Sequence, residues 1–405
     1  MKPGGLVTSV IFGSTLIVII VSLIPAVFPA LMTRMSSDFE DSLNVNPFEF
    51  GLLALPILCT NAIVLTLVVV HHKNKLPQKI TNAIRFIFNF EISAQVAFLV
   101  FVIITSFYIL ASIGELFNNK FDSDYYGIFK PWLETFNVFR LPDNQLNRDF
   151  GHHVQLFFGV ISMKVFGNYK VIPFIASIAS LIVIYLLTLE ISKKRFAGII
   201  SVIITVQSSV FLFYDTSVSY TNLWVLFYLL ALYTIYKKWQ LSTISFILAT
   251  LSKGLTTIFL PVTLFFIYRA EMPSRKKVII IVSYIIMAGI GIGFLSITGA
   301  KLNPVSSKSF DVISFLNGFT SFGFGFVHDV VIVSFLLSVI IGLFIVSKRG
   351  NVHADSIMLI ILIMLASAPF LSALSVNQNL PYRFVPLVVF FSIGVGVILS
   401  KRPIE

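Results

Sequence analysis

Two carboxylates, Asp122 and Asp124, stand two residues apart near the start of the longest polar stretch of the sequence, Asn118 to Gly151. In such a pair, one carboxylate can act as a general base on a hydroxyl nucleophile while the other orients it. Alternatively, both can hold a hard divalent cation through their oxygens. A solvated loop start that caps a helix is the alternative without chemistry.

Two cations adjoin apolar segments, Lys253 within residues 251–254 and Arg383 directly after Tyr382. A lysine at a helix break within the membrane is costly and usually faces a cavity, whereas one near a helix end can reach the headgroups. A guanidinium at position 383 can hold a phosphate through paired hydrogen bonds, or it can anchor the chain at the interface beside Tyr382. Together these cations suit an anionic ligand in the membrane, such as a lipid phosphate.

His152 and Asp215 are candidates for an accessory role. His152 is followed by His153, but adjacent histidines on a helix point apart and do not form a bidentate pair. His152 lies on a polar stripe over residues 152–162, where it can ligate a metal, orient a base or sit among the headgroups. Asp215 lies in a short loop and is expected to be solvated unless it converges with the acidic pair.

Membrane helices must position these residues, because the composition excludes a soluble fold. Apolar residues make up 57% of the 405 positions and charged residues 12%, and the mean hydropathy is +0.94. A soluble domain is about 25% charged. Long apolar runs recur throughout, which predicts an all-α, polytopic transmembrane helical bundle and excludes a soluble enzyme or a nucleic-acid-binding domain. The single cysteine, Cys59, excludes an intramolecular disulfide and a cysteine metal cluster.

Charge placement supports a map of about twelve crossings with a cytoplasmic N-terminus. The cytoplasmic segments carry 18 of the 29 Lys and Arg residues but 5 of the 18 Asp and Glu residues, as the positive-inside rule requires. This bias explains the net charge of +11 without a nucleic-acid partner. We expect a multi-pass protein of the cell membrane, or of the endoplasmic reticulum in a eukaryote, with an extracytoplasmic active site. The predicted spans are 6–31, 51–70, 92–113, 170–191, 196–213, 222–236, 241–252, 255–268, 278–298, 330–347, 356–376 and 384–400.

Two regions of this map differ from simple crossings. The runs 241–252 and 255–268 are about 18 and 21 Å long as helices, which is short of a hydrocarbon core of about 30 Å. The positive-inside rule favours two short crossings here, because a single crossing would place the later basic segments outside. The two runs then form a short broken hairpin with Ser252-Lys253-Gly254 at its outer tip. Residues 152–167 combine a polar and an apolar face and are expected to form a helix in the outer interface.

With these motifs in place, the chain resembles the GT-C fold of integral-membrane glycosyltransferases, in the branch of protein O-mannosyltransferases and lipid A aminoarabinose transferases. The resemblance runs from about Glu115 to Arg402, and four motifs in order carry it. They are the acidic motif at 121–125, the helix that ends in Val165-Phe166-Gly167, the break at 251–254 and the proline-flanked Tyr-Arg at 381–386.

The resemblance implies a glycosyltransferase that moves a sugar from a polyisoprenyl-phosphate donor to a protein, lipid or glycan acceptor, usually with inversion. Asp122 or Asp124 resembles the essential acid of the first outer loop, and the two would hold a divalent metal ion if one is used. Lys253 and Arg383 resemble the cationic groups that receive the lipid phosphate. His152, Asp215, Asn222 and Tyr382 are accessory candidates.

Departures from the family pattern keep two alternatives open. Many relatives carry an acid in a Thr-Asp-like context after the second outer loop, where this chain has Asn222, and the nearest acid is Asp215. A non-catalytic subunit of the same fold is therefore one alternative, and a secondary transporter with a broken helix is the other. The predicted organisation is N-terminal spans at 1–114, a large extracytoplasmic loop with an interfacial helix at 115–170, and the remaining core at 171–405.

Overall fold

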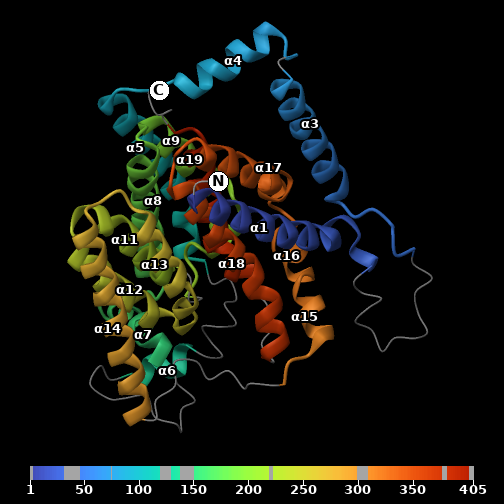
Figure 1. Cartoon of the computed structure of the whole chain (residues 1–405). Helices are drawn as coiled ribbons and strands as arrows, with labels where there is room; N and C mark the ends of the chain where they lie inside the picture. The colour runs from blue at the N-terminus through green and yellow to red at the C-terminus, as the bar shows by residue number, and fades with distance from the viewer. Residues whose placement is uncertain are drawn as a thin grey trace. The chain divides into compact units, whose positions relative to one another are not determined.

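The computed structural model describes residues 3–31, 46–73, 75–118, 129–136, 150–218, 222–298, 309–375 and 381–400. Every element of regular structure in these residues is a helix (Figure 1). The chain forms two compact units, one of Met1–Ala94, Ile191–Val210 and Val305–Glu405, the other of Gln95–Glu190 and Phe211–Pro304. The short helix α10 (Ser209–Tyr214) contributes residues to both.

The first unit is built around α19, most of whose side chains are buried. This helix packs against α9, α17 and α18, and α1 packs against α17 and α18. The backbones of α15 and α18 approach so closely that a Cβ at Gly318 would lie 2.3 Å from Pro369 Cα. The elements of this unit are α1 (Pro3–Val27), α3 (Ala54–His72), α4 (Gln78–Asn89), α9 (Arg195–Gln207), α15 (Val312–Gly318), α16 (Thr320–Gly325), α17 (Val330–Lys348), α18 (His353–Leu374), η6 (Pro381–Phe384) and α19 (Val385–Ile398).

In the second unit, α11 and α12 form the most extensive helix pair, and α12 also contacts α7 and α14. Aromatic pairs join α5 to α8, with Tyr108 and Phe174 ring centroids 5.7 Å apart. The elements of this unit are α5 (Ala94–Ser112), η1 (Ile113–Leu116), α6 (Lys130–Glu134), η4 (Phe150–His152), α7 (His153–Phe166), α8 (Val171–Ser192), α11 (Asn222–Lys237), α12 (Trp239–Ser252), η5 (Gly254–Phe259), α13 (Leu260–Arg269) and α14 (Ser274–Thr298).

Seven helices of the described residues are long and apolar enough to cross a membrane, so the chain is a multi-pass helical membrane protein. A helix suits these apolar runs because it satisfies its backbone hydrogen bonds internally, as lipid requires. The seven coincide with predicted spans and are Gly5–Val27, Ala54–His71, Ala94–Leu116, Val171–Ser192, Ser274–Ile297, Val330–Lys348 and His353–Leu374. The other five predicted crossings correspond to shorter apolar helices, and the run at 196–213 is two helices separated by extended Ser208.

Two predicted interruptions of helical structure are present. Helix α12 ends at Ser252, Lys253 is extended, and the 3-10 helix η5 begins at Gly254. Helix α7 ends at Phe166, and Gly167 has a φ of +65°, a left-handed conformation that glycine adopts at little cost.

Candidate functional site

Asp215 lies at the centre of a buried polar cluster in the second unit. It directly follows α10, and 1% of its surface is exposed. Its backbone oxygen accepts hydrogen bonds from Ser177 Oγ of α8 and Asn222 Nδ2 of α11, both at 2.8 Å. Residues of α8 and α11 therefore fix the position of this acid, which the sequence alone predicted to be solvated.

The carboxylate of Asp215 is less completely paired than its backbone. Both oxygens are buried without a hydrogen-bond partner within 3.5 Å among the described residues. Burial raises the pKa of Asp215 to about 6, and the charge of Glu115 adds to this, while the Ser112 and Tyr108 hydroxyls act in the opposite direction. A carboxyl with a pKa near neutrality can gain or lose a proton under physiological conditions, which is the property required of a general acid or base.

Glu115 and Lys170 connect this cluster to the start of the large loop. Thr216 Oγ1 donates to Glu115 Oε2 at 3.3 Å. Buried Lys170 donates through Nζ to the backbone oxygens of Glu115 and Asn118, both at 3.2 Å. A cation stabilises the carbonyl groups at the C-terminus of a helix, so Lys170 holds the point from which the loop departs.

Asn222, at the N-terminus of α11, acts as a hydrogen-bond donor in this cluster. Its Nδ2 contacts the backbone oxygens of Asp215 (2.8 Å), Tyr214 (3.1 Å) and Pro173 (3.4 Å). A carboxylate at this position could not donate these bonds. The structure thus brings Asn222 and Asp215 together, with Asn222 positioning the segment that carries the acid.

His152 and helix α7 lie beside the segment that follows Asp215. Gln155 Nε2 donates to Val218 O at 3.2 Å, and the His152 ring centroid lies 5.9 Å from that of Trp132. The polar stripe of α7 packs inward: His152, Gln155, Gly159 and Ser162 are all buried. The apolar residues Val165 and Phe166 are exposed instead, which suits contact with lipid.

Lys253 lies at the junction of α12 and η5 in the same unit. Its N–H donates to Ala249 O and its carbonyl accepts from Thr256 N, both at 2.9 Å, so the helix break is held by its own backbone. Helix η5 packs against η4, which contains His152. Phe259 of η5 also stacks on Trp224 of α11, with ring centroids 6.0 Å apart. The segments that carry Lys253, His152 and Asp215 are thus linked through η4, η5, α7 and α11.

Tyr382 and Arg383 belong to the first unit. Tyr382 is buried, and Arg383 Cζ lies 6.0 Å from the centroid of its ring, a cation–π distance. The next residue, Phe384, packs against the Phe326 ring at 5.2 Å, which fixes η6. Phosphate binding by Arg383 and Lys253 stays a prediction.

Asp122 and Asp124 lie outside the described residues, so their role as base or metal ligands also stays a prediction. Among the residues that the structure does describe, no group of three or more His, Cys, Asp or Glu side chains is arranged to hold a metal. The sequence reasoning missed Tyr108, Ser112 and Lys170 as members of the cluster. The available signal was polar residues at the ends of otherwise apolar runs, on either side of the large loop.

The fold and this site define a multi-pass helical membrane protein with a buried polar cluster around Asp215 in its second unit. Comparison with known protein families, with curated proteins and with solved structures finds no match. The function must therefore be argued from the cluster itself and from the sequence motifs around it.

Proposed function

We propose that the protein is a GT-C-type membrane glycosyltransferase with about twelve crossings, which transfers a sugar from a polyisoprenyl-phosphate donor on the extracytoplasmic side. One observation carries this proposal. Asp215 is a buried acid with a pKa near neutrality. Its neighbour Thr216 donates a hydrogen bond to Glu115, which stands just before the loop that contains Asp122 and Asp124. Acidic residues beside a large polar loop are the arrangement that the resemblance leads us to expect.

In the proposed reaction, Asp122 or Asp124 accepts the proton of an acceptor hydroxyl. The hydroxyl oxygen forms a bond to the anomeric carbon from the face opposite the donor phosphate, and the bond from that carbon to the phosphate oxygen breaks. The polyisoprenyl phosphate leaves with an additional negative charge, which Lys253 and Arg383 stabilise. Asp215 takes the place of the second acid that is replaced at position 222, and it orients the first.

The test is transfer by the purified full-length chain in detergent or nanodiscs, with a panel of radiolabelled polyisoprenyl-phosphate sugars. Release of label from the lipid should fall by about 10²- to 10⁴-fold when the base is lost, so we expect this loss for the Asp122→Asn plus Asp124→Asn variant. Asp215→Asn should also lose activity but should remain folded, because the substitution removes a buried charge.

Glu271→Gln is the matched control, since Glu271 is an exposed acid in the turn between α13 and α14. It should retain full activity. Label release that is unaffected by loss of both Asp122 and Asp124 would contradict the assigned site. Tight donor binding without release would favour the non-catalytic subunit.

A secondary transporter is the second candidate, because the helix break at Lys253 is present and such breaks form substrate sites in transporters. This function predicts uptake of substrate into sealed vesicles without cleavage of any lipid-linked sugar. The two assays on one preparation therefore distinguish the candidates: label release supports the glycosyltransferase, and uptake without release supports the transporter.

A further inference from the structure

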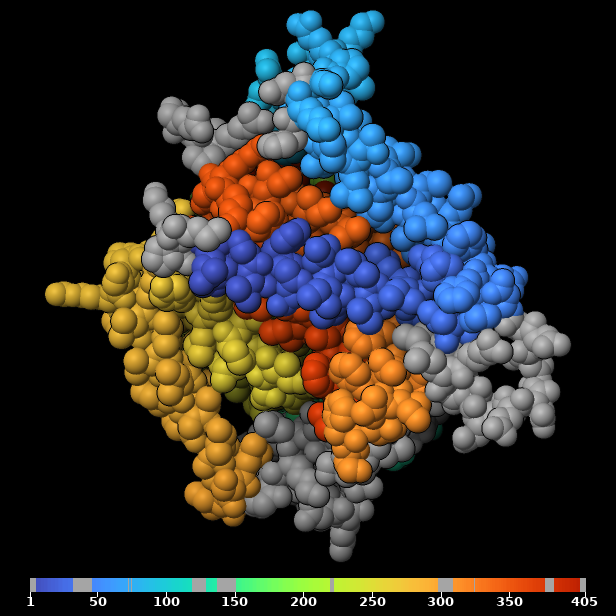
Figure 2. Space-filling view, turned by 45° about the vertical axis from the view of Figure 1, so that its right-hand side comes forward, coloured from blue at the N-terminus to red at the C-terminus, as the bar shows by residue number. Residues whose placement is uncertain are grey.

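Helix α4 in the first unit has an apolar face that no other element of the described residues buries. Ile80, Ile84 and Ile87 recur at helical spacing on one side, with Asn82 and Arg85 on the other. Ile80 is 40% exposed and Ile87 47% exposed. The helix is visible at the top of Figure 2, where its side chains project from the surface.

The neighbours of α4 in the chain place both of its ends close to candidate membrane spans. It follows α3 and precedes α5, and both contain candidate membrane spans. The connections are residues 73–77 and 90–93, which reach at most about 18 and 14 Å when fully extended. Helix α4 itself is about 18 Å long, and Figure 1 shows it running across the end of α3 rather than in line with it.

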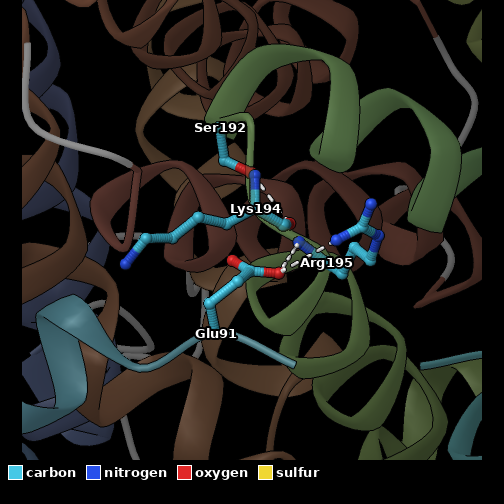
Figure 3. A network of polar contacts seen from close by, with 4 residues as sticks. All are labelled: Glu91, Ser192, Lys194 and Arg195. Atoms are coloured by element: carbon cyan, nitrogen blue, oxygen red, sulfur yellow. Dashed lines mark hydrogen bonds and ion pairs between the residues drawn. The ribbon is translucent and has the colours of Figure 1, made fainter. Parts of the chain in front are cut away.

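The C-terminus of α4 is attached to the turn between α8 and α9 (Figure 3). Lys194, which is buried, donates through Nζ to Phe88 O in the last turn of α4. Arg195 N donates to Glu91 Oε1 at 3.0 Å, and its guanidinium lies 4.0 Å from the same oxygen. The rings of Phe90 and Phe196 meet edge to face at 4.8 Å. These contacts attach the C-terminal end of α4 to the turn between α8 and α9.

The charge of this region indicates what the helix binds. Residues 71–90 contain four Lys and Arg residues and two histidines but neither Asp nor Glu. Lys73, Lys75, Lys79 and Arg85 are exposed. An amphipathic helix with basic residues and a free apolar face inserts that face at the boundary between headgroups and acyl chains and attracts anionic lipids.

We propose that α4 is an in-plane interfacial helix whose apolar face lies among acyl chains and whose basic residues, with Lys73 and Lys75, bind anionic phospholipid headgroups. The occupant of the face is the bilayer, and the binding chemistry is that of the lipid phosphate. This role is independent of the sugar transfer proposed above, because it involves none of the residues of the polar cluster around Asp215.

The position of α4 is tested with nitroxide labels on the full chain in vesicles of phosphatidylcholine and phosphatidylglycerol at 3:1. Cys59 is the only cysteine, so Cys59→Ser provides the background for single labels at Ile87→Cys and Asn82→Cys. We expect oxygen, which concentrates among acyl chains, to relax the label at position 87 more strongly than the label at 82. An aqueous nickel chelate should instead relax the label at 82 more strongly than the label at 87. Equal access of the chelate to both labels overturns the proposal, as does shielding of label 87 from both reagents, which would mean that a protein segment covers the face.

The lipid preference is tested by native mass spectrometry of protein released from the same vesicles. Neutralising the basic residues of this region should lower the ratio of retained phosphatidylglycerol to phosphatidylcholine roughly fivefold or more, since each basic residue near a membrane contributes about one fivefold step. A matched variant neutralises four basic residues at the end of α13 and in the first turn of α14, outside the amphipathic helix, and should change the ratio much less. An unchanged ratio, or equal losses in both variants, overturns the proposal. The two variants are Lys73→Gln/Lys75→Gln/Lys79→Gln/Arg85→Gln and Arg269→Gln/Arg275→Gln/Lys276→Gln/Lys277→Gln.

Discussion

Two buried aspartates, Asp329 in the first unit and Asp215 in the second, are held in opposite ways. Asp329 is 5% exposed and accepts three hydrogen bonds, from Ser208 Oγ at 3.0 Å, Ser209 N at 2.7 Å and Val210 N at 3.0 Å. Asp215 is 1% exposed, and its carboxylate oxygens have no such partner among the described residues.

The difference separates a structural acid from a candidate functional one. The partners of Asp329 include backbone N–H groups in the first turn of α10, where the helix dipole also favours a negative charge. Its burial is fully explained by these bonds. Asp215 follows the other end of the same helix, where the dipole opposes a negative charge. A buried and incompletely paired carboxylate costs stability, which makes Asp215 the candidate for the functional role proposed above.

The largest effect is expected from Asp329→Ala. This change leaves two backbone N–H groups and one hydroxyl without their acceptor in a buried site, which should cost about 3 kcal/mol or more in unfolding free energy. The measurement is unfolding of the purified protein in a denaturing-detergent titration. Ser208→Ala removes only one of the three bonds and should cost about 1 kcal/mol. Equal stability of Asp329→Ala and the wild type would show that this acid is not structural.

The pH dependence of stability provides the second test, at Asp215. Its pKa is raised from 3.8 to about 6, so between these pH values the folded state binds more protons than the unfolded state. The contribution of Asp215 to the unfolding free energy is therefore highest below about pH 4. It decreases by about 3 kcal/mol in all as the pH rises to about 6. Asp215→Asn should remove this decrease and should make the protein more stable than the wild type at pH 7.

The two substitutions should then change the unfolding free energy in opposite directions at neutral pH: Asp329→Ala should lower it and Asp215→Asn should raise it. Unfolding titrations of wild type and Asp215→Asn from pH 4 to pH 8 provide the measurement. Parallel profiles for the two proteins would mean that Asp215 does not titrate in this range, and the contrast with Asp329 would then be lost.

The local features of the fold could be predicted from the sequence, because each depends on residues close together in the chain. The seven long spans follow from hydropathy, and the interruptions at Lys253 and Gly167 follow from glycine and polar residues within apolar runs. The isoleucine spacing of α4 was also visible, but its basic residues were used only to orient the spans. A short helix that does not cross the membrane is not detected by a search for crossings.

The polar cluster around Asp215 could not be predicted, because it depends on contacts between distant segments. Asp215 meets side chains more than 100 residues earlier, Tyr108 and Ser112 at the end of α5. The same applies to the inward packing of the polar stripe of α7, where Gln155 is bonded to Val218 O. The position of this helix in the outer interface stays a prediction. The roles of Asp122 and Asp124 were predicted from motif order alone and stay predictions.

The smallest effect is expected at a third acid, Glu91, which is exposed rather than buried. Its side chain is 37% exposed, and its ion pair with Arg195 spans 4.0 Å. Exposed pairs of this kind contribute less than about 1 kcal/mol, and a glutamine can still accept the hydrogen bond from Arg195 N. Glu91→Gln should therefore change the unfolding free energy by at most about 0.5 kcal/mol in the same titration. A loss above about 1 kcal/mol would show that charge, rather than backbone hydrogen bonding and the Phe90–Phe196 contact, holds the end of α4. In that case burial alone would not explain how the three acids differ.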